Sequence, residues 1–140
     1  MSALASSKAP EEALIRAGEG PSTVNQGGVT WQELGAPGHD LEPAILTVPA
    51  GEGSGGRYSR AGETFVLLQE GALAFTIWSP EPREIALRPG DALTIPPRAR
   101  LEWHNAGRVT SRALWVESLI GQPMTAAADR TRRHATAEGQ

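Results

Sequence analysis

The stretch GEGSGGRYSRAGETFVLLQEG, residues 51–71, decides the fold. A glycine-rich segment leads into a short β-like run at 57–60. A turn at Gly62 precedes a second run at 64–70, which Gly71 closes. Successive side chains of a strand point to opposite faces, and TFVLL is apolar at both alternating sets of positions. The pattern predicts two strands joined by a turn, the second of them covered on both faces.

Further short runs with strand character surround this stretch, separated by breaks such as SPEP, RPGD and NAG. They occupy residues 29–34, 43–50, 72–78, 83–87, 91–96, 100–105 and 112–119. Many short strands punctuated by turn residues, without helical periodicity, are typical of a β-sandwich or a small barrel. We therefore expect an all-β fold.

The two ends of the chain differ from the middle. Residues 1–27 form an N-terminal arm, in which PEEALIRA predicts at most one short helix. Residues 121–140 are polar and alanine-rich, which is typical of a frayed helix or an unstructured tail. The single domain is therefore expected at residues 28–120.

Composition excludes several classes of function. A chain of 140 residues suits one domain with a sizeable core. Its net charge of -3 argues against a nucleic-acid surface, and no apolar run is long enough to cross a bilayer. The N-terminus lacks the apolar core of a secretion signal, so we expect a cytoplasmic protein. With no cysteine and three histidines, any metal site must be poor in imidazole.

Two stretches, in order, resemble the motifs of the cupin superfamily. The first is residues 51–71; the second, GDALTIPPRARLEWHN, has Gly90, Pro96 and Asn105 at matching offsets. The chain is similar to the cupin type-2 domain of small stand-alone bacterial cupins. The pattern YSRAGETF…EG also resembles the C-terminal cupin domain of helix-turn-helix regulators. The resemblance implies a double-stranded β-helix, the jelly-roll barrel.

The chain departs from the family at every metal-ligand position. Tyr58, Arg60, Thr64 and Leu101 stand where the family has its ligands, and Arg98 replaces the inner glycine of the second motif. A divalent ion needs neutral imidazole or ionised carboxylate, and a guanidinium offers no lone pair. We therefore expect a barrel without a metal and without a cofactor.

Potential substitute ligands lie next to these positions. Glu63, Glu102 and His104 have the wrong parity, so in regular strands they face away from the barrel interior. We expect all three to be solvated. The alternative is a β-bulge that rotates Glu63 or His104 inward.

The replaced positions are expected to line a small-molecule pocket. In the family the ligands project into the mouth of the barrel, so Tyr58, Arg60 and Thr64, which share parity around the turn, would form one wall. Leu101 and Trp103 share parity on another strand and would add an apolar floor. An apolar pocket with a few converging polar groups is typical of a ligand site.

Arg60 is the most informative of these residues, because a buried guanidinium is costly unless it meets an anion. The anion is either a ligand carboxylate or enolate, held bidentately, or an internal carboxylate. Internal candidates are Glu33, Glu63, Glu102 and Glu117. Glu117 shares parity with Trp115 and could reach inward; Trp115 could stack on a planar ligand, although core packing is the commoner role.

Tyr58 and Arg60 together suggest chemistry. A nearby cation favours proton loss from Tyr58, which could then act in general acid/base catalysis while Arg60 stabilises an enolate. The alternative is a tyrosine whose hydroxyl only caps a neighbouring strand. Arg98 and Arg100, near the mouth, are ordinary surface charges by default and could instead attract an anionic ligand.

Three functions remain open. The first is a metal-independent isomerase or cyclase acting on a carboxylate-bearing or enolisable substrate. The second is a non-catalytic binding or sensing module, and the third a metal-dependent oxygenase with non-standard ligands. The Ala-, Gly-, Arg- and Pro-rich composition resembles that of high-GC bacteria, whose stand-alone cupins often serve secondary metabolism. Because TFVLL is apolar on both faces, we also expect a homodimer; cover by the N-terminal arm is the alternative.

Overall fold

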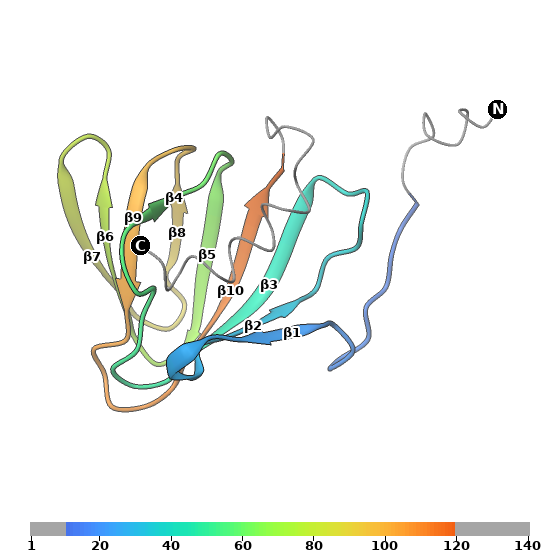
Figure 1. The fold of residues 1–140 in the computed structure, drawn as a ribbon, viewed down its shortest axis with the longest axis horizontal. Coiled ribbons are helices and arrows are strands. Elements are labelled where there is room, and N and C mark those ends of the chain that lie inside the picture. The colour runs from blue at the N-terminus through green and yellow to red at the C-terminus, as the bar shows by residue number, and fades with distance from the viewer. Residues whose placement is uncertain (1–10, 120–140) are drawn as a thin grey trace.

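The structure, a computed structural model, describes residues 11–119. They form two antiparallel sheets that lie face to face around one apolar interior (Figure 1). The strands are β1 (Ser22–Val24), β2 (Thr30–Glu33), β3 (Leu41–Val48), β4 (Tyr58–Ser59), β5 (Thr64–Glu70), β6 (Leu73–Trp78), β7 (Pro82–Leu87), β8 (Ala92–Ile95), β9 (Arg100–His104) and β10 (Ser111–Ser118). A short 3-10 turn, η1, covers Gln26–Gly28.

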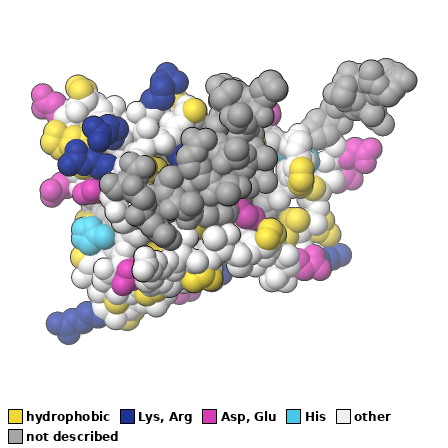
Figure 2. Space-filling model, viewed as in Figure 1, with side chains coloured by type: hydrophobic (Ala, Val, Ile, Leu, Met, Phe, Trp, Pro, Cys, Tyr) yellow, Lys and Arg dark blue, Asp and Glu magenta, His cyan; other side chains and the backbone are white. Residues whose placement is uncertain are grey.

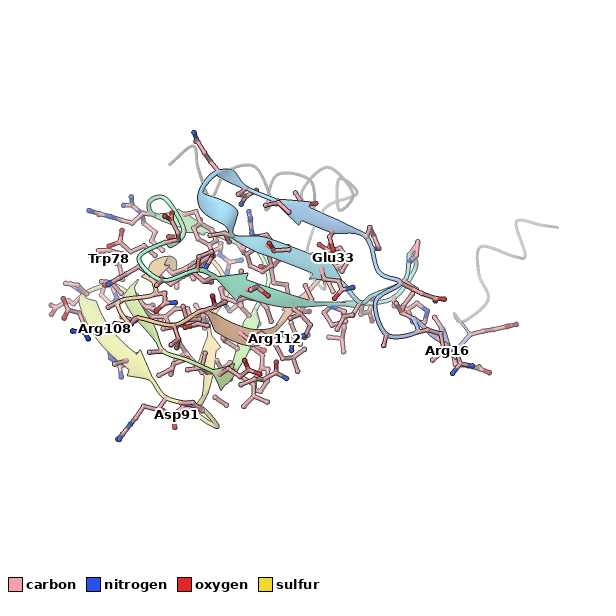
Figure 3. The ribbon with its side chains drawn as sticks, turned by 90° about the horizontal axis from the view of Figure 1, so that it is seen from below. Arg16, Glu33, Trp78, Asp91, Arg108 and Arg112 are labelled. Atoms are coloured by element: carbon pink, nitrogen blue, oxygen red, sulfur yellow. The ribbon has the colours of Figure 1, made fainter. Side chains whose placement is uncertain are left out.

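The strand order is that of a double-sheet jelly roll. The larger sheet runs β1-β2-β3-β10-β5-β8 and the smaller one β4-β9-β6-β7, so the chain passes repeatedly from one layer to the other. Figure 3 shows the two layers from below, with side chains filling the space between them. The predicted all-β jelly roll is confirmed.

Strand β10 lies at the centre of the larger sheet. It pairs with β3 from Ser111↔Val48 to Ser118↔Leu41, and with β5 on its other side. Its residues alternate between buried and partly exposed positions, so Trp115 and Glu117 face the interior while Val116 faces out. Register on both sides of β10 therefore decides which side chains meet inside the barrel.

Aromatic side chains fill the interior. Trp31, Trp103 and Trp115 are each at most 2% exposed. The Trp31 ring lies edge-on to the other two indoles, with centroids 5.2 Å from Trp115 and 6.1 Å from Trp103. Edge-to-face pairs contribute about 0.5–1.5 kcal/mol beyond their buried area. Phe75 stacks on Trp115 at 6.2 Å and extends this indole cluster to the smaller sheet.

The outer face of the larger sheet is also apolar. Cross-strand rows bring Leu114 beside Leu67 and Ile45, and Val116 beside Phe65, on the side away from the core. These side chains are half-buried, apart from Phe65, which is 37% exposed. The apolar side chains of TFVLL therefore divide between the two sides of the sheet. One set packs in the core, and the other set lies on this outer face.

Most predicted strands lie within two residues of the observed bounds. One feature of the N-terminal arm was predicted wrongly: residues 22–24, expected in a loop, form β1 against β2. The sequence predicted at most one short helix in this arm, and residues 11–17 form none. Glu11 to Leu14 are exposed, so no packed face stabilises a helix there. The predicted tail, 121–140, lies outside the described residues. Within residues 11–119 no helix has the length and apolar character of a membrane span.

Candidate functional site

One end of the barrel interior collects the residues singled out from the sequence. Tyr58, Arg60, Thr64 and Leu101 are 8%, 7%, 3% and 2% exposed. Tyr58 lies opposite Leu101 on the β4–β9 pair, and Thr64 lies opposite Glu117 on the β5–β10 pair. The four positions thus line the interior from both sheets, above the indole cluster.

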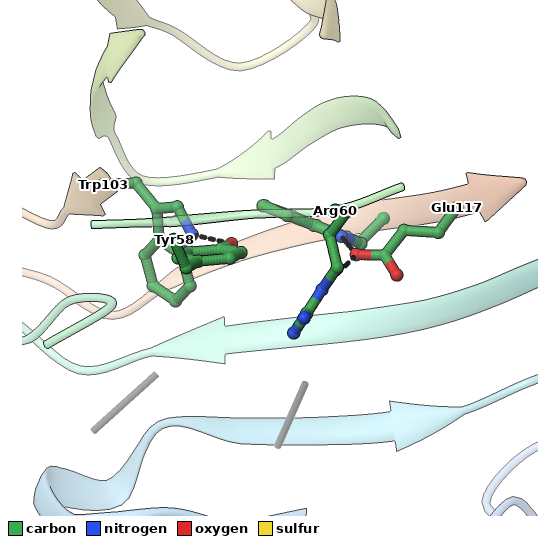
Figure 4. Close-up of polar contacts among 5 residues, drawn as sticks. Tyr58, Arg60, Trp103 and Glu117 are labelled. Atoms are coloured by element: carbon green, nitrogen blue, oxygen red, sulfur yellow. Dashed lines mark hydrogen bonds and ion pairs between the residues drawn. The ribbon is translucent and has the colours of Figure 1, made fainter. Parts of the chain in front are cut away.

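Tyr58 is held by the indole beneath it. Trp103 Nε1 donates a hydrogen bond of 2.8 Å to Tyr58 Oη, as Figure 4 shows. The guanidinium carbon of Arg60 lies 5.1 Å from the centroid of the Tyr58 ring, within cation–π range. A donated hydrogen bond and a nearby cation favour negative charge on the phenol oxygen, whereas burial of Tyr58 disfavours it. The geometry therefore accommodates acid/base chemistry at Tyr58, and it equally gives this hydroxyl a structural partner.

Arg60 follows β4 and its side chain is 6% exposed. Its Nε lies 3.8 Å from Glu117 Oε2, which is an ion pair but too long for a hydrogen bond. Within residues 11–119, neither Nε nor Nη2 has a hydrogen-bond partner. In Figure 4 the guanidinium end extends away from the Glu117 carboxylate. A buried charged donor left unsatisfied destabilises the fold, and these two atoms form one edge of the guanidinium.

Glu117 faces the interior from β10 and is 3% exposed. Its Oε2 accepts a hydrogen bond of 2.9 Å from Trp115 Nε1. Trp115 itself is fully buried in the indole cluster, so its ring packs in the core. Of the internal carboxylates weighed for Arg60, Glu117 is the one that the structure brings to the guanidinium.

A further acidic residue, Glu42, was missed in the sequence analysis. It lies directly opposite Glu117 on the β3–β10 pair and is 3% exposed. The signal was available, because Glu42 has the same parity as the buried residues Ala44 and Leu46 of β3. Glu33 on β2, one of the internal candidates for Arg60, is 8% exposed and is labelled in Figure 3. The described barrel therefore buries three carboxylates, Glu33, Glu42 and Glu117, of which Glu117 faces Arg60.

The residues predicted to be solvated lie outside the barrel. Glu63 and His104 are exposed, and Glu102 is half-buried on the outer face of the smaller sheet. Glu102 and His104 line a surface cavity of about 240 Å³ together with the loop at 53–56. A second cavity, of about 380 Å³, lies beside the N-terminal arm and is lined by Glu12, Ala13, Leu34, Gly35, Ala36, His39, Leu41 and Pro43.

Comparison with known proteins agrees with this architecture. The family model described as "Cupin domain" matches residues 44–117, just over half of the chain. The chain belongs to the cupin family. The match includes the part of the barrel that carries Tyr58, Arg60 and Glu117. The comparison with curated proteins gives no match.

Solved structures show the same fold at low identity. Hydroxypropylphosphonic acid epoxidase from S. wedmorenis has a TM-score of 0.66 at 17% identity, over 76% of this chain and 59% of that one. The cupin domain of Schizosaccharomyces pombe Cnp3 has a TM-score of 0.58 at 12% identity, over 73% and 66%. The conserved SPY1581 protein of unknown function from Streptococcus pyogenes has 0.56 at 18%, over 69% and 78%. This cupin spans about three fifths of the epoxidase chain, and the likeness shows the fold alone.

The ligand positions of this cupin do not fit a divalent metal. Tyr58, Thr64 and Leu101 supply no imidazole or carboxylate, and the fixed charge of Arg60 repels a cation. Among the described residues no three His, Cys, Asp or Glu side chains converge as a metal site would require. The described residues therefore do not supply the metal ligands that a cupin oxygenase would need.

We predict that the untagged protein, purified without chelators, carries less than about a tenth of an equivalent of any transition metal, because the donors are missing. Elemental mass spectrometry measures this directly. As a control, the protein is incubated with excess Fe²⁺ or Zn²⁺ and passed through a desalting column before measurement. Near-stoichiometric metal in either sample would contradict the prediction.

Proposed function

We propose that this cupin is a metal-independent protein that binds a carboxylate-bearing or enolisable organic molecule inside the barrel. We further propose that the protein converts this molecule as an isomerase or cyclase. One observation carries the proposal: Arg60 Nε and Nη2 are buried without a hydrogen-bond partner in residues 11–119. These two donors lie on the same edge of the guanidinium. That edge is the fork that takes a carboxylate with two parallel hydrogen bonds.

The unsatisfied donors of Arg60 support binding of an external anion in addition to the ion pair with Glu117. Moving a guanidinium from water into the protein interior costs on the order of several kcal/mol. Ion pairing and hydrogen bonds can offset this cost. Glu117 offsets part of this cost, yet its oxygen stays 3.8 Å from Nε and accepts from Trp115 instead. A ligand carboxylate or enolate oxygen at hydrogen-bond distance would satisfy the donors that Glu117 leaves unsatisfied.

The chemistry we propose is proton transfer. Tyr58 Oη, as phenolate, takes a proton from the carbon next to the ligand carbonyl. The electron pair of that C–H bond forms the C=C bond of an enolate, whose negative oxygen is stabilised by Arg60. Return of the proton to the other face of the carbon, or to another carbon, gives the isomer and restores the phenolate. The step is redox-neutral and uses groups of this chain alone.

A non-catalytic binding or sensing module is the second candidate. The observation in its favour is the hydrogen bond from Trp103 Nε1, which gives the Tyr58 hydroxyl a structural role in the core. In that case Arg60 alone would select the ligand, and occupancy of the barrel rather than turnover would be the output.

Arg60→Met tests the proposed site. We expect acetate, pyruvate or benzoate to raise the Tm of the wild type, while neutral benzamide has no effect. The substitution should weaken anion binding at least tenfold, because it removes the only guanidinium buried in the described barrel. Without ligand, the variant should be less stable by about 3 kcal/mol, since it removes the cation that faces the buried Glu117 carboxylate.

The matched control is Arg112→Gln, on the outer face of the larger sheet, which should bind the anions as the wild type does. Thermal shift followed by isothermal titration measures both quantities. Equal anion binding by wild type and Arg60→Met would refute the site.

Tyr58→Phe separates the two candidate functions. Exchange of the pyruvate methyl protons for deuterium, followed by NMR in D₂O, reports enolisation. If the isomerase proposal is right, the wild type accelerates exchange above buffer. The variant loses this acceleration at least a hundredfold while its pyruvate Kd stays within about threefold. If wild-type exchange equals buffer, or if the substitution changes affinity alone, the binding module is the correct function.

We also propose that a second copy of the chain covers the outer face of the larger sheet. The six strands of the larger sheet, three to eight residues long and about 4.8 Å apart, present a face on the order of 500 Å². A standard interface buries about 800 Å² per partner, so this face would form the centre of a dimer interface whose rim extends beyond the sheet. Leu67 and Leu114, at its centre, are apolar cross-strand neighbours.

Light scattering after size exclusion tests this interface. We expect twice the mass of one chain for the wild type and the mass of one chain for Leu67→Lys, because a charge at the centre of the apolar face would be desolvated in the dimer. Thr76→Lys, on the outer face of the smaller sheet, is the matched control and should remain a dimer. A monomeric wild type would contradict the proposal.

A further inference from the structure

The turn between β8 and β9 contains an arginine in an unfavourable backbone conformation. The Ala99 N–H donates to the carbonyl of Pro96 at 3.4 Å, and Arg98, the third residue of this turn, has a φ of 66°. With Pro97 in the second position, these are the features of a type II turn, whose third residue is usually glycine. Among residues 11–119, no other non-glycine residue has a positive φ. The backbone at Arg98 is therefore strained in a way that glycine would not be.

This turn is bonded to the residue that carries the proposed anion site. The Arg98 N–H donates to the carbonyl oxygen of Arg60 at 2.7 Å. Arg98 itself is exposed, and within the described residues its guanidinium forms no ion pair. The main chain of Arg98 is thus bonded to that of Arg60, and the exposed Arg98 side chain carries a positive charge that no carboxylate of residues 11–119 pairs.

Two more exposed arginines lie on neighbouring segments. Arg57 stands just before β4, and Arg100 stands at the start of β9, directly across from Ser59. Figure 2 shows basic side chains on the side of the molecule formed by the smaller sheet, with acidic side chains among them. Arg57 lies over the ring of Trp78, 4.3 Å from its centroid, whereas no such contact is formed by Arg98 within the described chain.

We propose that Arg98 attracts the anionic ligand to the mouth of the barrel and delivers it to Arg60, and that this role keeps an arginine where the turn favours glycine. The inference rests on the proposed function, since it presupposes an anion bound at Arg60. Charges at the rim of a site act mainly by steering, and this effect is screened by salt. One exposed charge near a site changes the local concentration of a monovalent anion roughly two- to threefold at low salt.

Three substitutions separate charge from strain. Arg98→Gln keeps the strain and removes the charge, Arg98→Lys keeps both, and Arg98→Gly removes both. Because the hydrogen bond to Arg60 comes from the main chain, every variant retains it. Wild type and variants are titrated with acetate, pyruvate and benzoate at 20 mM and 500 mM NaCl. Benzamide serves as the neutral probe, and Tm is measured without ligand.

At 20 mM NaCl we expect Arg98→Gln and Arg98→Gly to weaken anion binding about two- to threefold, while Arg98→Lys matches the wild type. At 500 mM NaCl the differences should disappear. Arg98→Gly should raise Tm by about 3 °C because the strain is relieved. Arg98→Gly would then bind the anions more weakly than the wild type and still be the more stable protein.

Each other outcome has a distinct meaning. Unchanged affinity in Arg98→Gln, or a loss that persists at 500 mM NaCl, would overturn the steering role while leaving the Arg60 site intact. A lower Tm for Arg98→Gly would show that the turn does not select against arginine and would also overturn the inference. If the wild type binds none of the three anions, the proposed function itself fails.

Discussion

The pairing of β10 with β3 on one side and β5 on the other is the constraint on which the rest of the structure depends. Eight consecutive cross-strand pairs with β3 fix the register of the central strand. A slip by one residue would turn Trp115 and Glu117 outward and bring Leu114 and Val116 into the core. The apolar interior and the buried polar residues are therefore determined together, because the apolar side chains that must be buried select this one register of the backbone pairs.

The polar end is unusual because acidic groups and a guanidinium share an interior otherwise filled by indoles. Glu117 is tied to Trp115 and Tyr58 to Trp103, so the two indole N–H groups each support one oxygen at the mouth. Arg60 has no comparable support for Nε and Nη2 in the described residues. The group with the greatest need for a hydrogen-bond partner thus lies where the family places its metal.

Strand positions could be predicted from sequence because apolar alternation and turn residues act locally. The same alternation correctly predicted that Leu101 and Trp103 would be buried and that Glu63 and His104 would be exposed. Glu42 was missed because Pro43, which lacks an N–H, was taken as the first residue of β3, although the strand begins at Leu41. The distance between Arg60 and Glu117 could not be predicted either, because it depends on how two side chains from different strands pack around the indoles.

The closure of this barrel has a consequence for how its chemistry can change. Most of its stability comes from backbone pairing and from a cluster of packed tryptophans, and one hydrogen bond, from Trp103 to Tyr58, links that cluster to a ligand position. Substitutions at the four ligand positions therefore change the chemistry of the interior while the strand pairing stays the same. The same barrel can in this way carry different chemistry, and each change affects stability only through the few contacts of the replaced side chain.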